Sequence, residues 1–225
     1  MKKIIPLFLL FSLLCRNNPE SVPLGTWNYT LLMNGVEIGR AVMSNRISDN
    51  NYVSTTEMEI NSGGFRNFSK QIITETMNFI PVKAESHNKT VNGGVHEASV
   101  IAEFSGNEVA VERNGIKIRI TLKKPFFLDG GFFLSELVKK KFAVGAEIKT
   151  FIYEPSMEIE EPIPVRVKVL GRSGVTVNGK NRSLLHVIES MENHKFVDSY
   201  LDDKGVPQKI TIAMLNSRIE LVIQE

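Results

Sequence analysis

The Asn-Gly dipeptide is the feature that most constrains the fold, because it recurs between stretches of alternating apolar and polar residues. It occurs at Asn34-Gly35, Asn92-Gly93, Asn114-Gly115 and Asn178-Gly179. Both central residues of a type I′ turn have positive φ, which asparagine and glycine tolerate, so each dipeptide predicts a β-hairpin. Consecutive hairpins predict an antiparallel meander.

Alternating segments fill most of the chain between these turns. In the stretch 109–122, Val109, Val111, Ile116 and Ile118 alternate with polar or charged neighbours. We expect strands at about 26–33, 36–47, 52–60, 65–79, 82–91, 95–104, 108–113, 116–122, 146–154, 163–170, 173–178, 180–190, 196–201, 206–213 and 216–223. Sheets with this many strands curl or split, so we predict a mainly β fold, either a strongly curved sheet or an incomplete barrel. Charged residues on the outward faces argue against a transmembrane barrel.

The stretch 124–142 departs from this alternation and predicts one amphipathic helix at about residues 131–142. Phe133, Leu137 and Val138 lie on one face at helical spacing. Asp129 is placed to cap the N-terminus, and the lysines at 139–141 complement the helix dipole at the C-terminus. We expect this central helix, near residues 125–142, to join two β halves of a single β-rich domain at residues 25–225.

The N-terminal residues 1–15 have the layout of a bacterial lipoprotein signal peptide. Lys2 and Lys3 precede an apolar run at 4–14, and the only cysteine, Cys15, follows it. The segment resembles the lipobox family, which implies lipidation of Cys15 and an anchor in the bacterial envelope. The anchored protein would lie at the outer membrane, on its periplasmic or surface face. An ordinary signal peptide with an incidental cysteine, or an uncleaved anchor, remains the alternative.

Residues 16–24 are polar, contain two prolines and show no periodicity, so we predict a flexible tether. Removing Lys2 and Lys3 from the 27 basic residues leaves 25, which equals the number of acidic residues. Without a cationic excess, nucleic acid is not an expected partner. The expected partners are the membrane, through the acyl anchor, and an apolar small molecule or another envelope protein.

The sequence contains no recognisable motif of catalytic residues. The segment 171–174 (GRSG) is not the G-x-S-x-G elbow and fits a turn between strands. The acidic stretch 154–161 lacks the spacing of a calcium-binding loop, and we interpret it as a solvated connector. We therefore predict no catalytic residues and no cofactor, and expect a protein that is not an enzyme.

Two histidine pairs are the candidates for a metal site. A two-residue turn at Asn92-Gly93 would pair Lys89 with His96, so that His87 and His96 become diagonal neighbours on one hairpin. They would still need a third ligand to hold a metal. His186 and His194 are eight residues apart. We interpret all four as ordinary strand and hairpin residues and predict no metal.

An aromatic cluster surrounds the predicted helix and leaves two interpretations open. Five of the chain's 13 phenylalanines lie at 126, 127, 132, 133 and 142. In the first interpretation they fill the core between the β halves. In the second, an apolar ligand contacts Phe126, Phe127, Phe133, Leu137 and Phe142 in a cavity gated by the helix. Glycines 130 and 131 would then act as the hinge of a lipid or lipoprotein carrier.

Residues 27–39 (WNYTLLMNGVEIG) resemble the opening of a bacterial envelope β-rich domain family of unknown function. Similar signals follow at Gly145, Pro155, 169–171 and the hairpin at 200–209, so the resemblance spans about 25–223. This family occurs in free-standing periplasmic or lipoprotein form and beside transglutaminase-like domains. The resemblance implies an antiparallel β fold, an envelope location and no catalytic residues. We expect a non-catalytic binding or structural module, with the carrier as the alternative.

Overall fold

The computed structural model describes residues 22–128, 130–157, 161–191, 195–214 and 217–225. Its elements in chain order are β1 (Gly25–Met33), β2 (Val36–Ser48), β3 (Asn51–Ser62), β4 (Phe65–Thr76), β5 (Pro81–Val91), β6 (Val95–Ser105), β7 (Glu108–Arg113), β8 (Ile116–Thr121), α1 (Phe132–Lys139), β9 (Glu147–Ile152), β10 (Ile163–Val177), β11 (Lys180–Met191), β12 (Lys195–Leu201), β13 (Pro207–Met214) and β14 (Ser217–Ile223). The predicted lipidation site Cys15, the predicted cap Asp129 and His194 lie outside the described residues.

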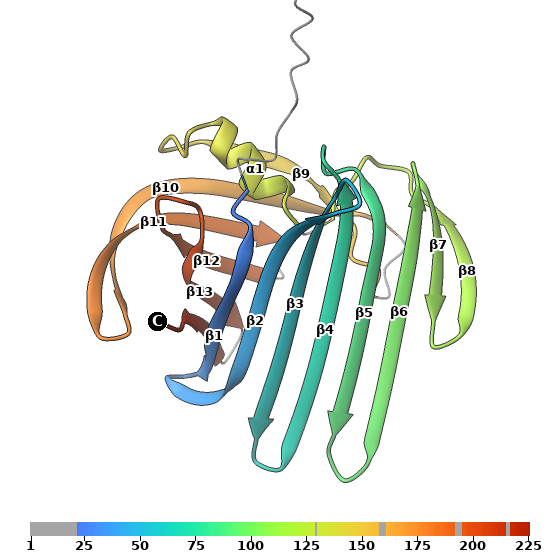
Figure 1. The fold of residues 1–225 in the computed structure, drawn as a ribbon, viewed down its shortest axis with the longest axis horizontal. Coiled ribbons are helices and arrows are strands. Elements are labelled where there is room, and N and C mark those ends of the chain that lie inside the picture. Colours follow the sequence, from blue (N-terminus) through green and yellow to red (C-terminus); the bar gives the residue numbers. More distant parts are fainter. Residues whose placement is uncertain (1–21, 129, 158–160, 192–194, 215–216) are drawn as a thin grey trace, which may run out of the picture.

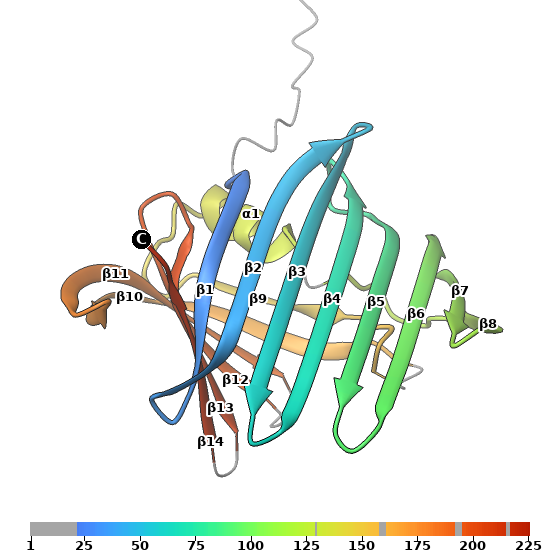
Figure 2. The same ribbon diagram turned by 60° about the horizontal axis from the view of Figure 1, so that its bottom comes forward.

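All 14 strands belong to one antiparallel sheet that curls around α1 without closing (Figures 1 and 2). The strand order runs from β8 back to β1, crosses to β14 and continues down to β9. The first and last strands therefore lie side by side in the middle of the sheet, with Tyr29 opposite Ile223 and Leu31 opposite Leu221. The prediction of a mainly β antiparallel meander with one helix is confirmed.

Three of the four Asn-Gly turns have the predicted conformation. The values of φ are positive for both residues at Asn34-Gly35 (52° and 82°), Asn114-Gly115 (49° and 84°) and Asn178-Gly179 (49° and 73°). The fourth prediction is wrong, because the β5–β6 loop contains Gly94 as a third residue and Val91 pairs with Val95. A change of one residue in register moves every following side chain to the other face of the sheet.

The predicted turn at 171–174 is also wrong, because β10 is a continuous strand of 15 residues. Instead of a turn, the register of the β10–β11 pair shifts between Val169 and Gly171, where φ of Gly171 is +112°. A bulge at a glycine bends a strand without ending it. The two strands that the sequence predicts at 163–170 and 173–178 are therefore one.

Helix α1 covers one end of the curled sheet and packs its apolar face inward. Phe133 and Leu137 are buried in a cluster with core residues of β9, β10 and β11, which are Ile148, Ile152, Val165, Val167, Val169, Leu185 and Val187. The first described residue, Val22, is buried beside Tyr52 and Phe79 at the same end. Among the described residues, no helix has the length and apolar character needed to cross a membrane.

Candidate functional site

The five residues of the predicted apolar ligand site lie in different parts of the core. Phe133 and Leu137 are buried, and Phe142 packs against the same cluster. Phe126 instead contacts Phe104 and Tyr153, with ring centroids 5.7 Å and 5.8 Å apart.

Phe127 is held in a different way. Its ring stacks on that of Phe132, with centroids 3.5 Å apart. Its backbone N–H donates to the Phe151 carbonyl at 3.0 Å, which continues the edge of β9. None of the five residues of the predicted ligand site lines any of the hollows described below.

The start of α1 is fixed by a residue far away in the sequence. The N-cap is Gly131, not Asp129. The Gly131 N–H donates to a carboxylate oxygen of Glu75 at 3.3 Å, and Glu75 is fully buried on β4. A carboxylate at this position is favoured by the positive end of the helix dipole. Burial and, second, the charge of Glu75 raise the pKa of the nearby Tyr52 hydroxyl above its ordinary value.

Glycines 130 and 131 are not placed as a hinge would be. A Cβ on Gly131 would lie 2.4 Å from the Phe79 ring and 2.8 Å from that of Tyr52, and one on Gly130 would lie 2.6 Å from Glu75. Gly131 has helical backbone angles, φ −80° and ψ −13°. Glycine is therefore required here for close packing rather than for conformational freedom.

His87 and His96 do not come together as metal ligands. His87 pairs with Ser99 and His96 with Thr90, so the two histidines point to opposite faces of the hairpin, and the diagonal arrangement is wrong. On β11, a nitrogen of His186 lies 2.7 Å from an Asp198 oxygen. Within the described ranges, no group of three His, Cys, Asp or Glu residues could hold a metal ion.

Residues 154–157, at the start of the acidic stretch, lie against the inner face of the sheet. The Glu154 carboxylate accepts hydrogen bonds from the Gln71 amide at 2.7 Å and from the Ser156 hydroxyl at 2.7 Å. Arg113 donates to the carbonyls of Pro155 and Met157 at 3.3 and 3.4 Å. The central part of the segment, 158–160, lies outside the described residues. Glu154 is therefore engaged in packing the segment onto β4.

Beyond this segment, the inner face of β4, β5 and β6 carries neutral polar side chains. Ile73 on β4 and Ala84 on β5 are buried against Leu128. Of the two alternating sets of residues on each strand, which we call its phases, the one that contains these residues therefore faces inward. Because side chains alternate along a strand, the same phase continues through polar residues toward the far end of the hairpins. We call these residues the inner polar surface: Asn67, Ser69, Asn88, Thr90 and His96.

The inner polar surface is arranged in two rows across paired strands. Ser69 pairs with Asn88, and Asn67 pairs with Thr90, which pairs in turn with His96. The Asn67 amide donates to the Thr90 hydroxyl at 2.9 Å. Asn67, Ser69, Asn88 and Thr90 are half-buried, and His96 is exposed. In Figures 1 and 2 the β3–β4 and β5–β6 hairpins extend past β1, β2, β7 and β8, away from α1. The rows therefore present hydroxyl and amide groups and the imidazole of His96, and none of the five residues is Asp, Glu, Lys or Arg.

The opposite, outer face of the same strands is charged. Lys70 forms an ion pair with Glu57 and Lys89 with Glu97, each at 2.7 Å. The two faces thus differ in kind, because the outer face carries paired ions and the inner face carries hydroxyl and amide groups. Alternating ion pairs are typical of a solvated sheet face, and each such pair contributes little stability.

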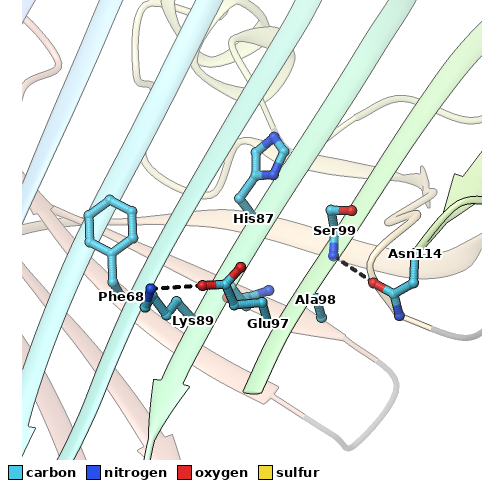
Figure 3. Close-up of a pocket in the computed structure, with 8 residues that line it drawn as sticks. Phe68, His87, Lys89, Glu97, Ala98, Ser99 and Asn114 are labelled. Atoms are coloured by element: carbon cyan, nitrogen blue, oxygen red, sulfur yellow. Dashed lines mark hydrogen bonds and ion pairs between the residues drawn. The ribbon is translucent and has the colours of Figure 1, made fainter. Parts of the chain in front are cut away.

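A hollow of about 420 Å³ lies on this outer face (Figure 3). Phe68, His87, Lys89 and Glu97 line it, and the Ser99 N–H donates to the Asn114 side chain at 2.8 Å at its edge. Hydrogen bonding by Lys89, and then its charge, lowers the pKa of Glu97 below its ordinary value. His87 and Ser99 are paired on β5 and β6, and in the described chain no hydrogen bond joins their side chains.

Other hollows are also open or very small. Two of about 430 and 420 Å³ lie over β6–β8, and one of about 320 Å³ lies over β9–β11. Under the acidic segment, between Gln71, Ser86 and Glu154, the free space is about 10 Å³. These volumes do not form an apolar chamber behind α1.

The inner polar surface also has a signal in the sequence. Along Asn67–Gln71 and Ser86–Thr90, both alternating phases are mostly polar, whereas a strand that packs on a core has one apolar phase. A strand with two polar phases therefore indicates a segment that extends beyond the core.

The comparisons with known proteins identify the fold only. No protein-family model and no curated protein matches the sequence. The chain is similar to the crystal structure of a beta-barrel-like protein of the domain of unknown function DUF1849 from Brucella abortus. That alignment has a TM-score of 0.63 and 14% identity, and it covers 89% of this chain and 95% of the other.

A DUF1089 family protein from Pseudomonas aeruginosa aligns with a TM-score of 0.40 and 11% identity, over 92% of this chain and 94% of the other. That score is too low to carry an argument. The similarity to the Brucella protein is to a β-rich protein of unknown function, which agrees with the kind of family that the sequence resembles.

Proposed function

We propose that this chain is a non-catalytic, lipid-anchored module of the bacterial envelope that binds an uncharged glycan on its inner polar surface. The observation that carries the proposal is the contrast between the two faces of β4–β6, with ion pairs outside and neutral hydroxyl and amide groups inside. Nearer α1 the same face of β4 and β5 is apolar and buried at Ile73 and Ala84, whereas the inner groups are half-buried or exposed and polar.

The chemistry of these groups favours a neutral polymer with hydroxyl and amide groups. Asn67 and Asn88 each offer donors and an acceptor, and Ser69 and Thr90 offer hydroxyls that do both. A chain of N-acetylhexosamine units presents matching hydroxyl and acetamido groups and has no charge to leave unpaired. Adjacent strands lie about 4.8 Å apart, so successive rows form a ladder of polar groups across which such a chain could run.

The surface is suited to binding rather than to reaction. Hydroxyl and amide side chains exchange hydrogen bonds, but they transfer no proton near neutral pH without an activating base. The only imidazole among the five residues, that of His96, lies at the exposed end of a row.

The alternative of a lipid carrier has less support. A carrier needs an apolar cavity that a ligand can fill, and such sites bury most of the ligand surface. Phe133 and Leu137 are instead buried against strands β9–β11. The hollows described above are open and lie elsewhere.

The envelope location rests on the order of charged residues, apolar run and cysteine at residues 1–15, and on the family resemblance. A producing bacterium grown with labelled palmitate should incorporate label into the parent and not into Cys15→Ala. Label in the Ala variant, or none in the parent, would contradict the lipid anchor.

Glycan binding is testable with chitotetraose as the probe, in calorimetric titrations of the purified protein. We expect saturable binding that Asn88→Ala weakens about 2- to 12-fold, the range for losing one hydrogen bond of about 0.5–1.5 kcal/mol. His87→Ala, at the adjacent residue on the outer face, is the matched control and should bind like the parent. Equal weakening by both variants, or binding of a neutral (Gly-Ser)₄ peptide in place of the sugar, would refute the proposal.

A further inference from the structure

The chain enters the fold at the α1 end of the sheet. Val22 is 3% exposed and packs with Tyr52 and Phe79, which contact Phe132 and Leu134 of the α1 segment. The next residue is also fixed, because the Asn45 amide donates to the Pro23 carbonyl at 3.1 Å. Any anchor that precedes Val22 is therefore attached to this end of the molecule.

The distance from the predicted anchor to this end is short. Val22 is seven positions after Cys15 in the sequence. A fully extended chain of that length spans at most about 25 Å. If Cys15 is acylated, the α1 end is held within about that distance of the bilayer surface.

This end also carries exposed apolar and basic side chains. Leu24, Ile47 and Ile80 are 49%, 44% and 56% exposed. Each is close to the buried cluster: Leu24 is two residues after Val22, Ile47 pairs with Tyr52, and Ile80 follows Phe79.

The basic residues lie at the end of α1, where Lys139 is its last residue and Lys140 and Lys141 follow it. Lys139, Lys140 and Lys141 are all exposed, and Lys139 pairs with Glu136 at 2.6 Å. In the part of the chain that the structure describes, no carboxylate lies within ion-pair distance of Lys140 or Lys141. Unpaired lysines and exposed aliphatic side chains at the same end of the sheet match the two attractions of an anionic bilayer, charge and apolar insertion.

Exposure alone does not distinguish the two ends of the sheet. Val36, Val95 and Ile116, at the opposite end, are 66%, 60% and 70% exposed. What differs is the combination, because only the α1 end also receives the chain from the predicted anchor.

We infer that the α1 end, with Leu24, Ile47, Ile80, Lys140 and Lys141, rests on an anionic lipid surface. This inference depends on the lipid anchor of the proposed function. In this orientation α1 faces the bilayer, and the inner polar surface lies at the far end of the hairpins, directed away from it. The envelope surface itself is thus the partner of this end.

The experiment uses the full-length acylated protein in vesicles that contain phosphatidylglycerol. With Cys15 acylated, a cysteine introduced as Ile80→Cys or Val95→Cys is the only free thiol and can carry an environment-sensitive fluorophore. We expect spin-labelled lipids to quench the probe at residue 80 several-fold more than the probe at residue 95. Replacing Lys140 and Lys141 by Gln should reduce that quenching, as should higher salt. Lys117→Gln is the control, because Lys117 is exposed on β8 and paired with Glu112.

Separate readouts distinguish the failure of the inference from the failure of its premise. Retention of the protein in the vesicle fraction reports the anchor, and quenching reports the face that is in contact. Retained protein with equal quenching at both positions would overturn this inference and leave the anchor intact. Protein that is neither acylated nor retained would overturn both.

Discussion

Replacing Gly131 by alanine tests whether α1 is a packed element of the core or a movable lid. The added Cβ would lie 2.4 Å from a Phe79 ring carbon and 2.8 Å from one of Tyr52. Both rings are buried, with 4% and 1% exposure, and they pack edge to face with centroids 5.4 Å apart. Neither ring can therefore move without disturbing the other.

The expected magnitude follows from overpacking. Forcing an extra methyl group into a packed core costs about 1–3 kcal/mol. The backbone of Gly131 suits alanine, and a Gly→Ala change alone stabilises by about 0.4–1 kcal/mol through the unfolded state. The net effect should be a loss of about 1–2 kcal/mol. For a chain of this size, that lowers the melting temperature by about 2–8 °C.

Denaturant unfolding followed by circular dichroism measures this loss, and two further variants make it specific. Gly174→Ala is the control, because its Cβ would meet only Asn181, at 3.5 Å, and it should be neutral or slightly stabilising. Phe79→Leu removes ring atoms that the new methyl group meets, so the double variant should lose less than the sum of the single variants. If Gly131→Ala is as stable as Gly174→Ala, α1 does not pack as we describe.

Three further outcomes follow from the same structure. Phe133→Ala should cost about 2–5 kcal/mol in unfolding free energy, whereas Val144→Ala, at a residue 76% exposed, should stay within about 0.5 kcal/mol of the parent; similar small effects for both would contradict the packing of α1. Gly179→Val forces a β-branched residue to a φ of 73° and should cost about 1–3 kcal/mol, so an unchanged denaturation midpoint would refute the type I′ turn. The pKa of Glu97, followed by NMR, should lie below its ordinary value and return toward it in Lys89→Ala; identical titrations would mean that the pair does not form in solution.

Local sequence patterns predicted the parts of the fold that local chemistry determines. Asn34-Gly35 and Asn178-Gly179 form the expected turns because the two residues that need positive φ are adjacent in the sequence. The prediction of a two-residue turn at Asn92-Gly93 was wrong because Gly94 can belong either to the loop or to the strand. Nothing local decides between these, yet the choice determines which face His96 occupies.

Long-range packing determines what the sequence did not show. The N-cap residue of α1, Gly131, donates its N–H to Glu75, which is 56 residues away and lies on a strand. The tight approach of Gly131 to Tyr52 and Phe79 is equally invisible in the sequence, so the glycines resembled a hinge. The contact of an apolar ligand with Phe126 or Phe142 stays a prediction.

The pairing of β1 with β14 has a consequence for how the chain acquires its structure. Tyr29, near the start of the described chain, pairs with Ile223, near its end, so the centre of the sheet forms only after the last strand is available. Hairpins such as β3–β4 join strands that are neighbours in sequence and can form early. The β1–β14 pair, which we call the seam, closes a loop that contains nearly all of the described residues. Until then, the backbone groups of β1 that face β14 remain open to another chain. We therefore expect slow folding, with the seam as the late step and self-association as its competing outcome.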